Sequence, residues 1–199
     1  MTGAAPATRG RPRDPELESR VFAAALSLYA EHGWSGFTLD AVARAAPAGR
    51  AALYRRWSGK AELLVAALEA TAPPIPPIDT GSVQGDLVEL VAHLMGSYTE
   101  PAGLVGLRAA LDARTHPELL APLSATLHGT RLASARALLQ RAVRRGELPR
   151  GAPATLLLEV LSGAALSHVL FAPGAAAPDD AELHRHARRL VELVLRAYR

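Results

Sequence analysis

The segment from Thr38 to Lys60 constrains the fold more than any other part of the chain. In its first half, apolar residues follow Thr38 at helical spacing, and the Thr38 hydroxyl can cap the helix that they form. Asp40 then lies near the positive end of the helix dipole. Pro47 lacks an N–H and disfavours helical geometry at Ala46, so the first helix should end there. The pattern predicts a short helix followed by a turn of about three residues.

A second short helix should follow this turn, with Gly49 as its cap and Arg50 as its first residue. Its apolar positions can dock inward and leave arginines on the exposed flanks, where guanidinium groups suit phosphate oxygens and guanine edges. Lys60 falls in the first turn of the next helix, where the dipole disfavours a positive charge. Another interaction has to hold this cation, and a phosphate is one such partner. A pair of short helices of which the second is basic indicates a DNA-binding motif.

The composition narrows the class of protein. The chain has 199 residues, enough for a small headpiece and a larger helical domain with a sizeable core. It has no cysteine, which excludes disulfides, thiolate nucleophiles and cysteine-based metal sites. No apolar run reaches the roughly 18 residues of a membrane span, and the N-terminus lacks the hydrophobic stretch of a secretion signal. We therefore expect a cytoplasmic protein without a membrane partner.

Positive charge is concentrated in the first part of the chain. Residues 1–60 hold nine Arg or Lys against five Asp or Glu, the remainder holds thirteen against fourteen, and the sum is the net charge of +3. Residues 1–14 form a basic arm rich in Gly and Pro, which we expect to be disordered. Its residues Arg9, Arg11 and Arg13 either reach into a minor groove or remain solvated, and the sequence favours neither.

Proline and glycine divide the rest of the chain into helical segments. Four prolines between positions 73 and 77 forbid a helix and predict an extended linker over residues 73–82. Asp179 followed by Glu182 is typical of a capping box. No segment alternates as strands do, so we expect an all-α fold: a three-helix headpiece, a linking helix and a larger helical bundle, with about nine helices in total. The helices are expected at 16–32, 39–46, 50–57, 58–70, 83–98, 102–113, 117–145 with a possible bend near Pro122, 153–171 and 179–198.

Residues 15–72 resemble the DNA-binding domain of the tetracycline-repressor (TetR) family of bacterial regulators. The run Leu-Tyr-Arg-Arg-Trp followed by Ser-Gly-Lys carries most of the specificity. The likeness is close from Pro15 to about Ala72, and the remainder is similar in helical layout and length. It implies a DNA-binding domain over residues 15–72 and a ligand-binding and dimerisation domain over residues 83–199. The matching positions are Gly33, Thr38, Val42, Ala43, Ala46, Leu53, Tyr54, Trp57, Lys60, Leu63 and Leu64.

The resemblance also implies which residues contact DNA: three of them face bases, Arg50, Ala51 and Ala52, and others hold phosphates. The sequence departs from the family pattern at Pro47, where a glycine is usual. Proline cannot adopt the positive φ that glycine permits, so the turn must be built differently. In addition, Ala52 replaces a common threonine and Arg56 a frequent histidine. The implied contacts are Thr38, Gly49, Arg50, Ala51, Ala52, Tyr54, Arg55, Arg56 and Lys60.

The last two expected helices carry more apolar residues than a small monomer needs. Pairing them with their copies in a second subunit would form a four-helix interface, as in the dimers of the family. The alternative is an ordinary core within one chain. The candidate interface residues are Val160, Leu161, Ala164, Ala165, His168, Leu190 and Val194.

A ligand cavity is expected among the helices that begin near residues 83, 102 and 117. Its lining should be largely apolar with a few aromatic or polar groups, although each candidate could equally be plain core or surface. The candidates are His93, Met95, Tyr98, His116, His128 and Phe171.

These features predict a homodimeric transcriptional regulator, a repressor that leaves a palindromic DNA operator when a small, largely apolar molecule binds its larger domain. The alternative is a helical small-molecule-binding or enzymatic module whose headpiece no longer reads DNA, because the turn at Pro47 is altered. Activation instead of repression also stays open. We expect no enzyme, metal or cofactor, since no nucleophile motif is visible and His184 and His186 face different directions on their helix.

Overall fold

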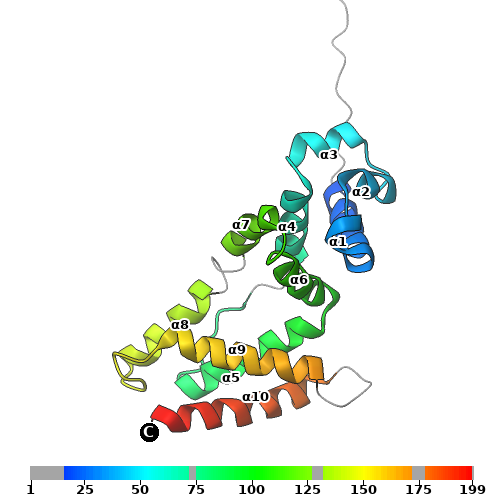
Figure 1. Ribbon diagram of the computed structural model, residues 1–199. Helices are drawn as coiled ribbons and strands as arrows, with labels where there is room; N and C mark the ends of the chain where they lie inside the picture. Colours follow the sequence, from blue (N-terminus) through cyan, green and yellow to red (C-terminus); the bar gives the residue numbers. More distant parts are fainter. Residues whose placement is uncertain (1–15, 72–74, 127–131, 172–177, 199) are drawn as a thin grey trace, which may run out of the picture.

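The fold is helical throughout the part of the chain that this computed structural model describes, residues 16–71, 75–126, 132–171 and 178–198 (Figure 1). This confirms the all-α prediction. The basic arm and His128 lie outside the described residues. The elements are α1 (Leu17–Gly36), α2 (Leu39–Ala45), α3 (Arg50–Arg56), α4 (Lys60–Thr71), α5 (Val83–Thr99), α6 (Pro101–Asp112), α7 (Pro117–Thr126), α8 (Leu132–Arg144), α9 (Ala154–Phe171), α10 (Asp180–Leu195) and a final 3₁₀ turn (Arg196–Tyr198).

The headpiece consists of α1, α2 and α3, and α4 leads from it towards the rest of the molecule (Figure 1). Helix α1 is interrupted near its end at Gly33, whose φ of 65° is not helical, although one further turn reaches Gly36. The hydroxyl of Thr38 accepts a hydrogen bond from the Ala41 N–H at 3.1 Å, which confirms its role as the cap of α2.

The turn between α2 and α3 corrects one prediction. We expected proline to require a different turn, yet Pro47 has a φ of 25°, on the positive side where glycine is usual. The Ala48 N–H donates to the Ala43 carbonyl at 3.0 Å, a closure typical of a helix end with a left-handed residue before the donor. Since the proline ring prefers φ near about −65°, this turn holds Pro47 in a strained conformation.

A second correction concerns the helix expected over residues 117–145. Two helices occupy this stretch, α7 and α8, so the described residues contain ten α-helices instead of about nine. They serve different cores: Leu119 and Leu123 of α7 pack with the headpiece, whereas Leu138 and Leu139 of α8 pack in the bundle. In Figure 1, α7 lies beside α4, and α8 lies beside α9. We expected a possible bend near Pro122, but α7 continues through that proline to Thr126.

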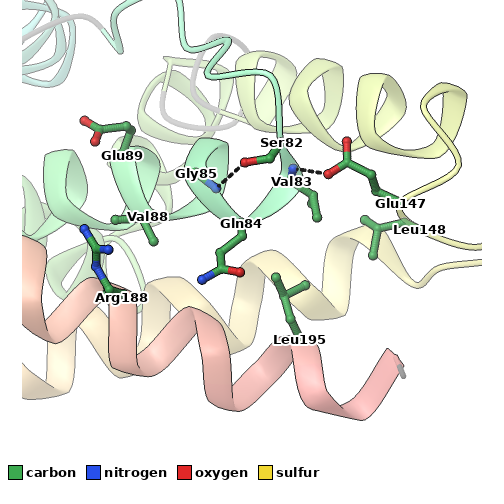
Figure 2. A pocket seen from close by; sticks show the side chains of 10 residues that line it. All are labelled: Ser82, Val83, Gln84, Gly85, Val88, Glu89, Glu147, Leu148, Arg188 and Leu195. Carbon is green, nitrogen blue, oxygen red and sulfur yellow. Dashed lines mark hydrogen bonds between the residues drawn. The ribbon is translucent and has the colours of Figure 1, made fainter.

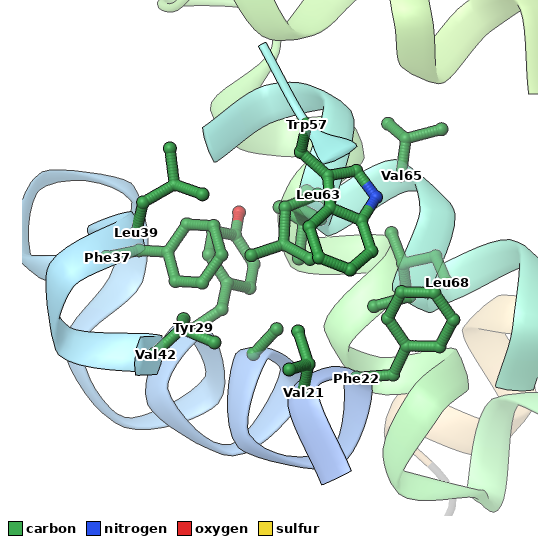
Figure 3. Close-up of a cluster of buried hydrophobic side chains, with 14 of the residues drawn as sticks. Val21, Phe22, Tyr29, Phe37, Leu39, Val42, Trp57, Leu63, Val65 and Leu68 are labelled. Carbon is green, nitrogen blue, oxygen red and sulfur yellow. The ribbon is translucent and has the colours of Figure 1, made fainter. Parts of the chain in front are cut away.

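The first of these cores extends well beyond the headpiece. Side chains of α1 to α4 form its centre (Figure 3). Helices α6 and α7 complete it, because Val105, Ala109 and Ala113 belong to the same buried cluster as Tyr29 and Leu63. The headpiece end of the molecule is therefore built from two separate stretches of the sequence.

The second core lies among α5, α8, α9 and α10. Helix α5 packs against both α9 and α10, and its Leu87 and Val91 are fully buried. Ser82 caps α5 by accepting a hydrogen bond from the Gly85 N–H. The predicted capping box of Asp179 and Glu182 is present at α10.

The segment 75–82 contains no helix or strand, as its prolines predict, but it is held firmly at its end. The fully buried Asp86 accepts hydrogen bonds from the Thr80 N–H at 2.6 Å and from Arg145 at 2.9 Å. Burial alone would raise the pKa of Asp86, but the bonds from Arg145 and Thr80 keep that pKa below its ordinary value. Arg141 adds a bond to the Ile78 carbonyl. The linker is thus fastened to the start of α5 and the end of α8.

Candidate nucleic-acid interface

Helix α3 lies at one end of the molecule, where it is open to solvent (Figure 1). Its buried side anchors it: Leu53 is 1% exposed, and the Trp57 ring that follows meets the Phe22 ring of α1 edge-on at 5.8 Å. The predicted contact residues Ala51, Tyr54, Arg55 and Arg56 are exposed and Ala52 is half-buried, and the exposed residues Thr38, Gly49 and Arg50 lie on the same headpiece.

Two of the three arginines on α3 have carboxylate partners. Arg50 forms a paired contact with Asp40 of α2, through Nε to Oδ1 at 2.7 Å and through Nη2 to Oδ2. Arg56 lies 3.6 Å from a carboxylate oxygen of Glu18. The sequence interpretation missed the pairing of Asp40, to which it gave only a role at the helix dipole. The signal was available, since a helix-turn-helix brings the start of α2 close to the start of α3.

Lys60 has a partner within the chain. Its ammonium donates to the Trp34 carbonyl at 2.7 Å and lies 4.1 Å from the centroid of the Trp34 ring. Burial lowers the pKa of Lys60, and the nearby Glu118 opposes this shift. The contact with Trp34 therefore explains why a cation lies in the first turn of α4. The phosphate contact stays a prediction beside it.

A polar junction joins the end of α1 to α6 and α7. The Trp34 indole N–H donates to Glu118 at 2.9 Å, and the Tyr29 hydroxyl donates to Asp112 at 2.5 Å. Burial and the bond to Asp112 raise the pKa of Tyr29 well above its ordinary value. Arg108 donates to the Ala30 carbonyl at 2.6 Å. These bonds tie the headpiece to the larger domain at three points.

The predicted ligand residues lie in different environments in the described part of the chain. Met95 is buried in the bundle core, His93 and Tyr98 are half-buried on the same helix, and Phe171 is 80% exposed. The His116 ring lies 5.8 Å from the Trp34 ring, at the junction. His128 lies outside the described residues.

Three pockets on the described surface have other linings. One of about 470 Å³ lies at the start of α5 and is bordered by polar groups such as Gln84 and Arg188 (Figure 2). A second, of about 400 Å³, lies between α8 and α9. A third, of about 1010 Å³, is a largely apolar groove between α1 and α6, with Leu26, Leu104 and Arg108 along it.

The predicted interface residues divide between two environments. Leu161 and Ala165 are buried in the core of their own chain, as the alternative interpretation required, whereas Val160 is 45% exposed. Ala164, His168, Leu190 and Val194 are half-buried. The His168 ring stacks on that of His186 with centroids 3.5 Å apart, and burial, with His168 adding to it, lowers the pKa of His186.

Helix α9 is the one described helix that is long and apolar enough to cross a membrane. Its 18 residues satisfy this condition by length and composition alone. Glu159 interrupts the apolar run, so the expectation that no uninterrupted apolar run reaches about 18 residues holds. One face of α9 packs in the bundle through Leu157 and Leu161. An apolar strip on one face of α9 stays exposed, formed by Leu156, Val160, Leu170 and Phe171.

Comparison with known proteins agrees with this architecture. Residues 21–67 match the family model for bacterial regulatory proteins of the tetR family, and residues 77–194 match the model for the tetracyclin repressor-like C-terminal domain. An uncharacterised HTH-type transcriptional regulator of Mycobacterium tuberculosis is 35% identical over 172 residues, covering 82% of this chain and 83% of its own. The DNA-binding transcriptional repressor TetR of Mycobacteroides abscessus is 38% identical over 88 residues, covering 43% and 44%.

A solved structure shares the fold over nearly the whole chain. The transcriptional regulator FadR of Bacillus subtilis, crystallised in complex with stearoyl-CoA, superposes with a TM-score of 0.64 at 13% identity, covering 89% of this chain and 97% of FadR. The fold and the helix-turn-helix define a DNA-binding transcriptional regulator, not an enzyme. The chain belongs to the TetR family.

Proposed function

We propose that this regulator is a homodimeric repressor that binds a palindromic operator and releases it when a small, largely apolar molecule binds. The observation that carries the proposal is the shared core of the headpiece with α6 and α7, reinforced by the bonds of Trp34 and Tyr29 to Glu118 and Asp112. A change in α6 or α7 cannot leave the headpiece unaffected. The repressor name of the mycobacterial relative supports repression. We place this action in the cytoplasm, with the DNA.

Dimerisation is supported by the apolar strip on α9. Val160 is 45% exposed and Phe171 80% exposed, and large apolar side chains gathered on one surface are typical of protein interfaces. A twofold partner would present two copies of α3 to half-sites about 34 to 36 Å apart. A single α3, only seven residues long, reads too few bases for a specific site.

The groove between α1 and α6 supports ligand control. Its volume of about 1010 Å³ suits a large apolar molecule, and a ligand there would touch the headpiece and the larger domain together. A ligand that prefers a conformation with misplaced headpieces weakens DNA binding by the same factor that DNA weakens ligand binding, typically about 5- to 150-fold. Because FadR was crystallised with stearoyl-CoA, this acyl-CoA is a sensible first probe.

Three measurements test the proposal. Sedimentation should give the mass of a dimer, gel shifts against DNA beside the gene should show binding at low salt, and stearoyl-CoA should weaken that binding. A folded dimer that binds no DNA at low salt would reject the repressor and favour the alternative, a helical ligand-binding module with a degenerate headpiece. Bound DNA that ignores stearoyl-CoA would reject this acyl-CoA as the ligand.

A further inference from the structure

We propose that Asp40 is a positioning residue that holds the Arg50 guanidinium so that it reads one guanine in each half-site. This inference rests on the proposed binding of α3 to DNA bases. It adds a residue that would help to determine which base α3 prefers. The structure places both groups on the exposed end of the headpiece: the side chain of Arg50 is 66% exposed and that of Asp40 is 31% exposed.

The contact geometry leaves the reading edge of Arg50 free. A guanidinium has five N–H groups in a rigid plane. Asp40 receives one from Nε at 2.7 Å and one from Nη2, both on the same side of the group. Three N–H groups remain, and two of them, one on each terminal nitrogen, point forward in parallel. Such a fork matches the O6 and N7 acceptors on the major-groove edge of guanine.

Asp40 is itself held in place. It lies in the first turn of α2, where the helix dipole favours a negative charge. The Tyr54 hydroxyl donates to the same Oδ1 at 3.3 Å, from the next exposed turn of α3. Arg50 thus approaches DNA with its long side chain already ordered, so less conformational freedom is lost when it binds a base.

Charge also directs Arg50 towards a base instead of the backbone. A carboxylate in direct contact repels phosphate groups and offsets the charge of the guanidinium, so the pair gains little from the DNA backbone. A neutral guanine edge brings no such repulsion. Arg56 is different, because Glu18 touches it through a single contact at 3.6 Å and leaves most of its N–H groups unrestrained.

The test is a selection of bound duplexes from random DNA by the full-length protein and its variants. Asp40→Asn keeps the shape of the side chain but removes the charge that orients Arg50. Glu18→Gln is the matched control, since it removes one negative charge beside Arg56 on the same headpiece. Arg50→Lys keeps the positive charge and Asp40 but lacks the fork, which makes the test independent of how well the Asp40 variant folds.

The wild type should select a guanine at one position of each half-site. Asp40→Asn and Arg50→Lys should reduce the preference for guanine at that position by about 5- to 140-fold, the span expected for loss of a bidentate pair. Glu18→Gln should keep the preference. A guanine preference that survives in Asp40→Asn would overturn the positioning role, and a rise in affinity for all sequences would show that Asp40 blocks Arg50. Absence of any bound duplex for the wild type would instead refute DNA reading itself.

Discussion

At the scale of single residues, the turn of the headpiece carries the main strain. Pro47 is the one residue other than glycine with positive φ among those described. Its ring prefers φ near about −65°, and a residue held in a sparsely populated conformation costs about 1 to 3 kcal/mol. The geometry persists because the helices on both sides are anchored by buried side chains such as Val42 and Leu53.

Replacing Pro47 with glycine should stabilise the protein. Relief of about 1 to 3 kcal/mol of strain exceeds the roughly 0.4 to 1 kcal/mol lost because glycine has more freedom in the unfolded chain. Thermal unfolding should therefore shift upward by a few degrees. Ala48→Gly, one position later, is the control and should lower the midpoint. A lower midpoint for Pro47→Gly would show that the turn does not strain the proline.

Substitutions at Lys60 and Arg55 should affect different properties, the first the free energy of unfolding and the second the affinity for DNA. Lys60→Met keeps the apolar stem but removes the bond to the Trp34 carbonyl, which should cost about 1.5 to 3 kcal/mol of unfolding free energy in urea. Arg55→Ala, an exposed change, should leave stability nearly unaltered but reduce the slope of log K against log salt by about 0.9. If Lys60→Met reduces the salt slope equally, Lys60 also contacts a phosphate. Unchanged stability would mean that the bond to Trp34 contributes nothing.

At the scale of elements, α9 has two faces with different tasks. Leu157 and Leu161 pack inside the chain, and Val160 projects from the exposed strip. Sequence periodicity located the helix and its apolar character, but it could not distinguish the two faces because both are apolar. Only the position of α5, which covers one face, decides which residues stay open.

Val160→Glu should therefore break the proposed dimer without unfolding the chain. A charge in the middle of an apolar interface is costly to desolvate, so sedimentation should give a monomer and specific DNA affinity should fall. Ala110→Glu adds the same charge at an exposed position of α6 and should leave the dimer intact. A dimer that survives Val160→Glu would place the interface elsewhere.

At the scale of the whole molecule, the chain contains two cores that do not follow its linear order. The sequence predicted the headpiece well, because Thr38 and the apolar spacing of its helices are local signals. The division of residues 117–145 into α7 and α8 could not be predicted, because the cause is tertiary: Leu119 belongs to one core and Leu138 to the other. The contact of Trp34 with Glu118, 84 positions away in the sequence, also depends on a distant partner.

Leucine-to-alanine substitutions, one in each core, should show that the two cores stabilise different helices. Leu119→Ala and Leu138→Ala each remove a buried leucine, 0% and 2% exposed, and should cost about 2 to 5 kcal/mol. In hydrogen exchange, Leu119→Ala should loosen α1 and α4 although it lies on α7, whereas Leu138→Ala should loosen α5 and α9. Equal loosening of both regions by either variant would mean that the two cores unfold as one.

The core shared by α1, α4, α6 and α7 limits how such regulators can be recombined. A chimera joined at the proline-rich linker would contain the DNA-reading helices without Val105, Ala109 and Leu119. These side chains belong to the same buried core as the helices. The transplanted piece would expose apolar surface unless the host supplied matching side chains on its own α6 and α7. Transferring the operator specificity of this protein to another regulator therefore also requires the apolar surface of α6 and α7. The chain encodes that surface more than thirty residues beyond the end of α4.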